Sequence, residues 1–126
     1  MSRVLLIDDN PVQLGVREAV LRKAGFQVSV ATTTESALAA LRAVGEKIGV
    51  VITDHVMPAS SGSELVRTIR AEYKCIPVIV LSGLPDAEIE YRGLDVVFRI
   101  KPLAPEDLIE LVRINLEEAT RQRGAA

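Results

Sequence analysis

The chain has 126 residues, 48% of them hydrophobic, and its 15 basic and 17 acidic residues give a net charge of −2 at pH 7. This length fits one domain with a sizeable core, and the near-neutral charge gives no reason to expect nucleic acid or a membrane surface as a direct partner. The single cysteine, Cys75, excludes a disulfide framework and a cysteine-rich metal site, and without a signal peptide or an apolar run of ~20 residues we expect a cytoplasmic protein.

Five apolar strand patterns alternate with helical patterns along the chain. The predicted strands cover residues 4–8, 27–31, 50–54, 77–82 and 96–101. Five strands that alternate with helices indicate an α/β fold with a parallel sheet covered on both faces. Because crossovers are right-handed, few arrangements remain, and one is the doubly wound (βα)5 fold, a flavodoxin-like three-layer sandwich with strand order 2-1-3-4-5.

Local signals mark the helices between these strands. Asn10-Pro11 predicts an N-cap with proline in the first helical turn, and Thr32 to Glu35 fits a capping box for the second helix. The apolar residues at helical spacing that we assign to the first helix are Val12, Val16, Ala19 and Val20. Only about two helical turns fit between Gly83 and Gly93, so we expect a short or irregular helix there. Cys75, between a helix and a strand, is expected to be a buried or half-buried thiol.

The last helix is predicted from Pro105 to about Glu118, so that a domain at 3–119 is followed by a short tail at 120–126. Its apolar residues are Leu108, Ile109, Leu111, Val112, Ile114 and Leu116. One stripe facing a sheet needs fewer, and the surplus suggests a homodimer or partner surface, with a deeply buried helix as the alternative.

Polar side chains follow four of the predicted strands directly. They are Asp8 and Asp9 after the first strand, Asp54 after the third, Ser82 after the fourth and Lys101 after the fifth. In doubly wound sheets ligands bind outside the carboxyl ends of the strands, so we expect these side chains to be neighbours. Three close carboxylates favour a hard cation such as Mg²⁺, and with no histidine or cysteine grouping nearby zinc is a poor candidate. Together with an ammonium and a hydroxyl they predict a phosphoryl-transfer site.

These residues give the chain a family resemblance. From Val4 to about Glu118 it resembles the receiver domain of two-component response regulators. The matching motifs are the Asp8-Asp9 pair, Asp54 to Pro58 followed by Gly62, Ser82-Gly83, and Lys101-Pro102. Each motif alone is weak, but all four in order, each at a strand end, are highly specific.

The resemblance implies a phosphorylation-dependent signalling switch, and not a metabolic enzyme, that accepts a phosphoryl group from a histidine kinase or a histidine phosphotransferase. Asp54 would be the phosphoacceptor. Asp9 would bind Mg²⁺ directly and Asp8 largely through water, with the Val56 backbone carbonyl as a further ligand and Mn²⁺ as a substitute ion.

The resemblance also implies a switching apparatus. Lys101 would hold the phosphoryl oxygens, and the Lys101–Pro102 peptide bond would be cis. Ser82 would move toward the phosphoryl group while Phe98 turns inward, although Phe98 also fits a plain, partly buried aromatic residue. A downstream protein would bind the face formed by residues 83–118. His55 should point away from the site, because it lies one residue beyond Asp54.

Three other functions are weighed against this one. Aspartyl-phosphate phosphatases and mutases carry an acid two residues after the nucleophile, where this chain has Val56, or Asn10 and Pro11 after the first aspartates. A flavin mononucleotide module would need a Ser/Thr/Gly-rich phosphate loop after the first strand, which is missing. A degenerate receiver that serves as a constitutive scaffold is disfavoured by the complete acidic set. Whether the chain is a stand-alone regulator or a receiver from a longer protein stays open.

Overall fold

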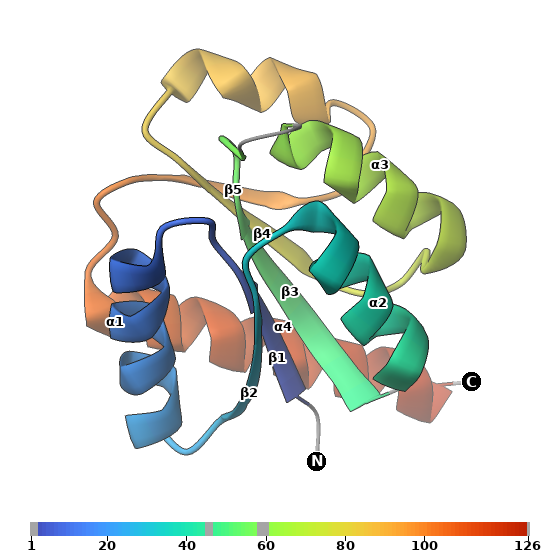
Figure 1. The fold of residues 1–126 in the computed structure, drawn as a ribbon. Helices are drawn as coiled ribbons and strands as arrows, with labels where there is room; N and C mark the ends of the chain where they lie inside the picture. The colour runs from blue at the N-terminus through green and yellow to red at the C-terminus, as the bar shows by residue number, and fades with distance from the viewer. Residues whose placement is uncertain (1–2, 45–46, 58–60, 126) are drawn as a thin grey trace.

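A computed structural model describes residues 3–44, 47–57 and 61–125. Its described residues form one parallel sheet with strand order β2-β1-β3-β4-β5 (Figure 1). The strands are β1 (Arg3–Ile7), β2 (Gln27–Ala31), β3 (Ile48–Asp54), β4 (Val78–Ser82) and β5 (Val97–Ile100). The predicted doubly wound fold and its strand order are therefore confirmed.

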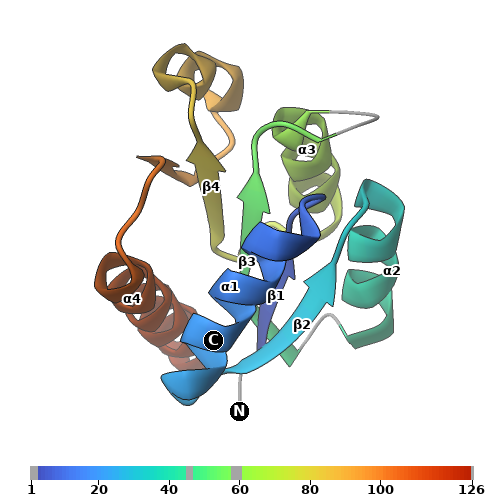
Figure 2. The ribbon, with the colours of Figure 1, turned by 60° about the vertical axis from the view of Figure 1, so that its left-hand side comes forward.

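Helices cover both faces of this sheet. They are α1 (Pro11–Lys23), α2 (Thr34–Val44), α3 (Gly62–Glu72), the 3-10 helix η2 (Pro85–Tyr91) and α4 (Pro105–Ala125). Figure 2 shows α1 and α4 on one side of the strands and α2 and α3 on the other. The short helix predicted between Gly83 and Gly93 is present as η2. No helix within the described ranges has both the length and the apolar composition that a membrane crossing needs.

The strands alternate their side chains between two buried clusters. In β1, Val4 and Leu6 pack with α1 and α4, whereas Leu5 and Ile7 pack with α2 and α3. All four are fully buried. A buried aliphatic side chain of this size contributes about 1.5–3 kcal/mol, which is why a strand covered on both faces appears in the sequence as a continuous apolar run.

The predicted apolar face of α1 is wrong. Its N-cap is confirmed, since the Asn10 side chain accepts from the backbone N–H groups of Val12 and Gln13 at 3.0 and 3.2 Å. The residues that α1 buries are Leu14 and Leu21, while Val12 is 74% exposed. Val16, from the same predicted stripe, is 60% exposed. The helix has two apolar stripes, and contact with β1 and β2 selects the one with the larger leucines.

The last helix is longer than predicted. α4 continues through Ala125 instead of ending near Glu118, and Ala126 lies outside the described residues. Most of the residues after Glu118 favour a helix and none is a proline, and Arg121 pairs with Glu118 at 2.6 Å. Most of the apparent surplus of apolar residues packs on the core: Leu108 and Val112 are buried, and Ile109, Leu111 and Leu116 are partly buried. Only Ile114 among the six is exposed, so the argument for a dimer surface loses most of its support.

Two smaller predictions are also wrong. The reciprocal cap of α2 joins Thr33 and Ser36, whose side chains accept from each other's backbone N–H at 3.0 and 3.1 Å, and not Thr32 and Glu35. The Ser36 hydroxyl takes the place of the Glu or Gln side chain of the usual capping box. Cys75 is exposed, because it lies in the turn between α3 and β4 where neither helix nor strand covers it.

Candidate functional site

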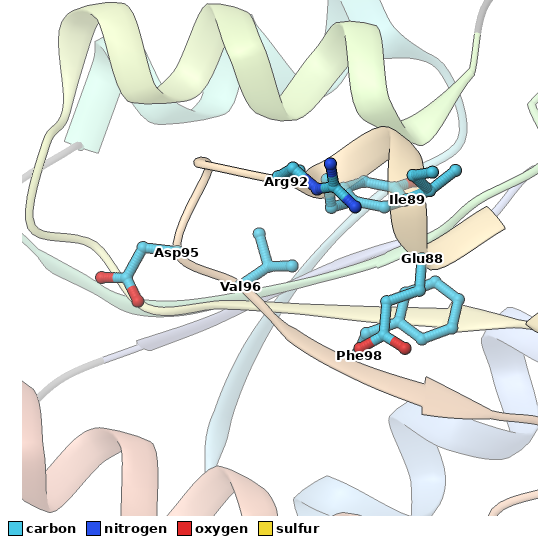
Figure 3. A pocket seen from close by; sticks show the side chains of 7 residues that line it. Glu88, Ile89, Arg92, Asp95, Val96 and Phe98 are labelled. Atoms are coloured by element: carbon cyan, nitrogen blue, oxygen red, sulfur yellow. The ribbon is translucent and has the colours of Figure 1, made fainter. Parts of the chain in front are cut away.

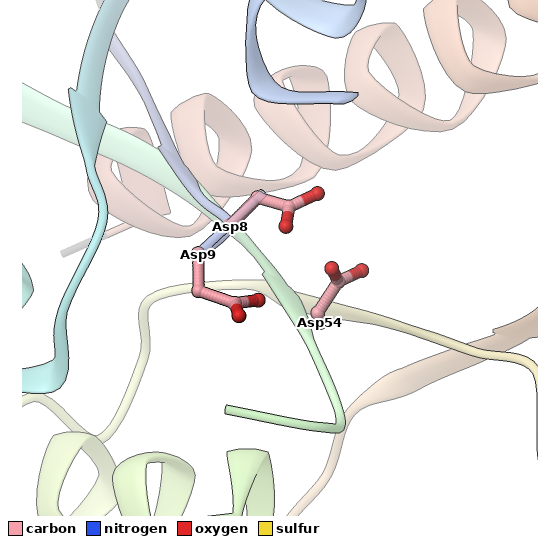
Figure 4. Close-up of side chains that lie close together, drawn as sticks. All are labelled: Asp8, Asp9 and Asp54. Carbon is pink, nitrogen blue, oxygen red and sulfur yellow. The ribbon is translucent and has the colours of Figure 1, made fainter. Parts of the chain in front are cut away.

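Three carboxylates meet where β1 and β3 end. Asp8 and Asp9 follow β1 and Asp54 closes β3, its neighbour in the sheet. Each offers an oxygen, and these oxygens lie within 4.8 Å of one another (Figure 4). Asp8 and Asp54 are buried and Asp9 is exposed. The predicted acidic site is therefore formed, and its all-oxygen donor set fits a hard divalent cation.

Asp8 is the most perturbed of these carboxylates. Burial and a hydrogen bond shared with Asp54 raise the pKa of Asp8 to about 6, from an ordinary value of 3.8. The backbone N–H of Asn10, which donates to Oδ1 at 2.9 Å, and the charge of Arg17 act in the opposite direction. Burial therefore disfavours the negative charge of Asp8, and a bound cation would stabilise that charge.

Two cations approach the carboxylates. The Lys101 Nζ lies 3.0 Å from Asp54 Oδ1, as the strand-end argument predicted. Arg17 of α1 was not predicted: one of its guanidinium nitrogens lies 2.7 Å from Asp8 Oδ2 and 3.3 Å from the same Asp54 Oδ1. The sequence does carry a signal for it, since Arg17 lies three residues after Leu14 and four before Leu21, between two residues of the buried stripe.

The ends of β4 and β5 are held together beside Asp54. The Lys101 N–H donates to the Ser82 carbonyl at 2.8 Å, and the Lys101–Pro102 peptide bond is cis, as predicted. The Ser82 side chain is buried, and its hydroxyl donates to the Leu84 carbonyl at 3.1 Å and accepts from the Leu84 N–H at 2.9 Å. In this structure Ser82 is therefore bonded to its own loop.

The segment after Asp54 lies against the N-terminal end of α3. His55 points away from the carboxylates, as predicted, and its Nδ1 lies 2.6 Å from the Tyr91 hydroxyl of η2. A Cβ on Gly62 would lie 2.6 Å from the Asp54 carbonyl oxygen and 2.7 Å from that hydroxyl, so the position tolerates only glycine. The Val56 side chain is exposed, and the role of its carbonyl stays a prediction; Pro58 of the motif lies outside the described residues.

Phe98 lies on the opposite face of the sheet from the carboxylates, the face that α2 and α3 cover. It is partly buried, its ring centroid lies 5.8 Å from that of Tyr91, and it lines a pocket of about 470 Å³ between η2 and β5 (Figure 3). Glu88, Ile89, Arg92, Asp95 and Val96 also line this pocket. The position suits a side chain that responds to η2, but its switching role stays a prediction.

Comparison with known proteins points to one family. Residues 4–113 match the family described as "Response regulator receiver domain". The chain is 32% identical over 126 residues to "Transcriptional regulatory protein PrrA" of Mycobacterium leprae, covering 98% of this chain and 52% of PrrA. It is 29% identical over 114 residues to "Putative two-component response regulator ARR21" of Arabidopsis thaliana, covering 90% of this chain and 19% of ARR21.

A solved structure agrees with these relatives. The chemotaxis response regulator CheY4 of Vibrio cholerae superimposes with a TM-score of 0.82 at 28% identity, over 91% of this chain and 98% of that one. The chain thus spans between a fifth and about half of the length of the two curated relatives, and nearly the whole of this structure.

Proposed function

The chain belongs to the receiver domain family of two-component response regulators, and from that membership we propose that Asp54 accepts the phosphoryl group that switches it. Phosphorylation-dependent switching is the function of this signalling family, and its phosphoryl donors are histidine kinases or histidine phosphotransferases. The observation that carries the assignment is the position of Asp54: a buried carboxylate beside two acidic neighbours, with Lys101 and Arg17 on one of its oxygens.

The proposed step is a displacement at phosphorus. An oxygen of Asp54 forms a bond to the phosphorus of a phosphohistidine, the phosphorus–nitrogen bond breaks, and the imidazole nitrogen leaves with the electron pair. Lys101 balances charge on the transferred oxygens. The Ser82 hydroxyl exchanges its bonds to Leu84 for one to the phosphoryl group, and Phe98 follows by turning inward.

The acidic cluster would hold the metal ion that the family uses. Asp8, Asp9, Asp54 and the Val56 carbonyl would hold Mg²⁺, and Mn²⁺ prefers the same oxygen ligands. When bound, the ion neutralises charge on the phosphoryl oxygens. The remaining work of positioning falls to the side chains around it.

The proposed output is a change in partner binding. A downstream protein would bind the face of residues 83–118, which includes the pocket beside Phe98. This binding would take place in the cytoplasm and would involve no direct contact with nucleic acid or membrane. A homodimer through α4 has only Ile114 as an exposed apolar contact from the predicted set. We therefore favour a different protein as the partner.

Incubation with acetyl phosphate and MgCl2, followed by intact-mass measurement, tests the proposal. We expect one acid-stable, base-labile phosphoryl group, which Asp54→Asn abolishes. Asp86→Asn, at an exposed aspartate of η2, is the matched control and should leave the incorporation unchanged. No incorporation into the wild type would support a constitutive scaffold instead, and incorporation into Asp54→Asn would place the phosphoryl group on another residue.

A further inference from the structure

Arg17 is a charged side chain that none of the matched motifs includes. It extends from the core-facing side of α1, and its side chain is 16% exposed. A single guanidinium nitrogen contacts Asp8 Oδ2 at 2.7 Å and Asp54 Oδ1 at 3.3 Å, so that it bridges the two buried carboxylates. The guanidinium is permanently charged and suited to carboxylates, and it therefore acts as a cation fixed at this site by its own helix.

We propose that Arg17 competes with Mg²⁺ for Asp8 and Asp54, and so sets the Mg²⁺ concentration at which Asp54 is phosphorylated. The inference rests on the proposed function and deepens it. A divalent ion that binds these carboxylates meets a positive charge already bonded to two of them. Even with water-like screening, a unit charge and a divalent ion a few ångströms apart repel enough to change an affinity about tenfold.

The contacts of Asp54 show which of its oxygens already binds cations. Arg17 and Lys101 both contact Oδ1, so two cations share one oxygen of the phosphoacceptor. With Asp8 and Asp9, three carboxylates face two cations, and only one negative charge is left uncompensated. Lys101 alone would leave two. Arg17 therefore removes half of the net charge that would attract a divalent ion.

The displaced guanidinium has space beside the site. A groove of about 480 Å³ runs between α1 and α4, and both Arg17 and Lys101 line it. The exposed valines of α1 form one of its walls, and Leu108 lies on the other side. An arginine stem packs well on such an apolar wall while the guanidinium remains in water. Arg17 lies on the carboxylates in this structure, and the groove offers its guanidinium a second position that Mg²⁺ binding would select.

Isothermal titration of the full chain with MgCl2 alone at pH 8 tests the competition. Arg17→Met removes the charge and keeps much of the apolar stem, and we expect Mg²⁺ to bind at least about tenfold more tightly than to the wild type. Lys23→Met is the matched control, because it removes the same charge from an exposed position on the same helix. Its affinity should stay within about twofold of the wild type.

A second variant guards against loss of folding. Arg17→Gln keeps an N–H donor for Asp8 and should also bind Mg²⁺ at least about tenfold more tightly. In both variants the MgCl2 concentration for half-maximal phosphorylation by acetyl phosphate should fall in parallel. Unchanged or weaker Mg²⁺ binding in the folded variants overturns the inference even if Asp54 is phosphorylated. A wild type that binds Mg²⁺ but takes no phosphoryl group refutes the proposed function. The Mg²⁺ titrations of the Arg17 variants still decide whether Arg17 competes with the ion.

Discussion

Replacing Asp8 with asparagine measures what the buried carboxylate costs the fold. Asparagine has the same shape, still accepts from the Asn10 N–H, and can donate permanently to Asp54, so it mimics the protonated form of Asp8. The pKa of Asp8 is raised from 3.8 to about 6, chiefly by burial. That difference corresponds to about 3 kcal/mol of unfolding free energy between the two protonation states.

The sign of the effect follows from the direction of the shift. The folded protein holds the Asp8 proton more tightly than the unfolded chain, so protonation stabilises the fold below pH 3.8. This stability is lost as the pH rises from about 4 through about 6. The asparagine variant has no such loss. Relative to the wild type, it should therefore gain up to about 3 kcal/mol between pH 4 and pH 7.5.

Urea unfolding in EDTA at several pH values measures this difference directly. Asp86→Asn, at an exposed position, controls for the loss of one negative charge and should show no comparable gain. Addition of MgCl2 should reduce the difference in unfolding free energy between Asp8→Asn and the wild type at pH 7.5. Ligand binding stabilises the wild type, whereas the variant has lost one metal-binding carboxylate. A difference between Asp8→Asn and wild type that is the same at pH 4 and pH 7.5 would refute the reasoning.

Two further predictions concern the segment after Asp54. Gly62→Ala should destabilise the fold by about 1–3 kcal/mol in thermal or urea unfolding, because its Cβ would lie 2.6 Å from the Asp54 carbonyl oxygen. Gly15→Ala, at an exposed position of α1, should instead stabilise the fold by about 0.5–1 kcal/mol. Equal effects of the two would contradict the proposed close approach. Tyr91→Phe leaves the buried His55 Nδ1 without its 2.6 Å partner and should cost about 1–3 kcal/mol of unfolding free energy. The control is Tyr73→Phe: the Tyr73 hydroxyl bonds to no described residue, and its loss should cost under about 0.5 kcal/mol. A larger loss of stability in Tyr73→Phe than in Tyr91→Phe would rule this explanation out.

The sheet and most of the site could be predicted because both depend on the strands. A continuous apolar run such as 50–52 is typical of a strand with both faces buried, and such strands are typical of a parallel sheet covered by helices on both sides. Once the strands are parallel, their carboxyl ends share one edge, so Asp54 and Lys101 lie on the same edge of the sheet, and the structure shows that they meet there.

The helices were less predictable, because a helix with two apolar stripes does not state which one faces the sheet. Valine at 12 and 16 and leucine at 14 and 21 are both at helical spacing, and only packing against β1 and β2 decides between them. The same choice hid Arg17, which is unremarkable on a solvent face and becomes part of the site only when the Leu14 stripe turns inward. The Ser82 hydroxyl and the end of α4 likewise depend on local contacts.

Asp54 and His55 connect the two faces of the sheet, because successive residues of a strand point in opposite directions. Asp54 meets the cations, while His55 on the other face bonds to Tyr91, which in turn touches Phe98. Burial raises the pKa of Tyr91, so its hydroxyl keeps its proton and can donate to His55. A shift of the β3 end on phosphorylation would therefore move η2 through a hydrogen bond as well as through Ser82. If this second connection matters, Tyr91→Phe should weaken the response of the Phe98 pocket to phosphorylation and leave the phosphorylation of Asp54 intact. The NMR chemical shifts of the residues on either side of Phe98 in the sequence can report this response.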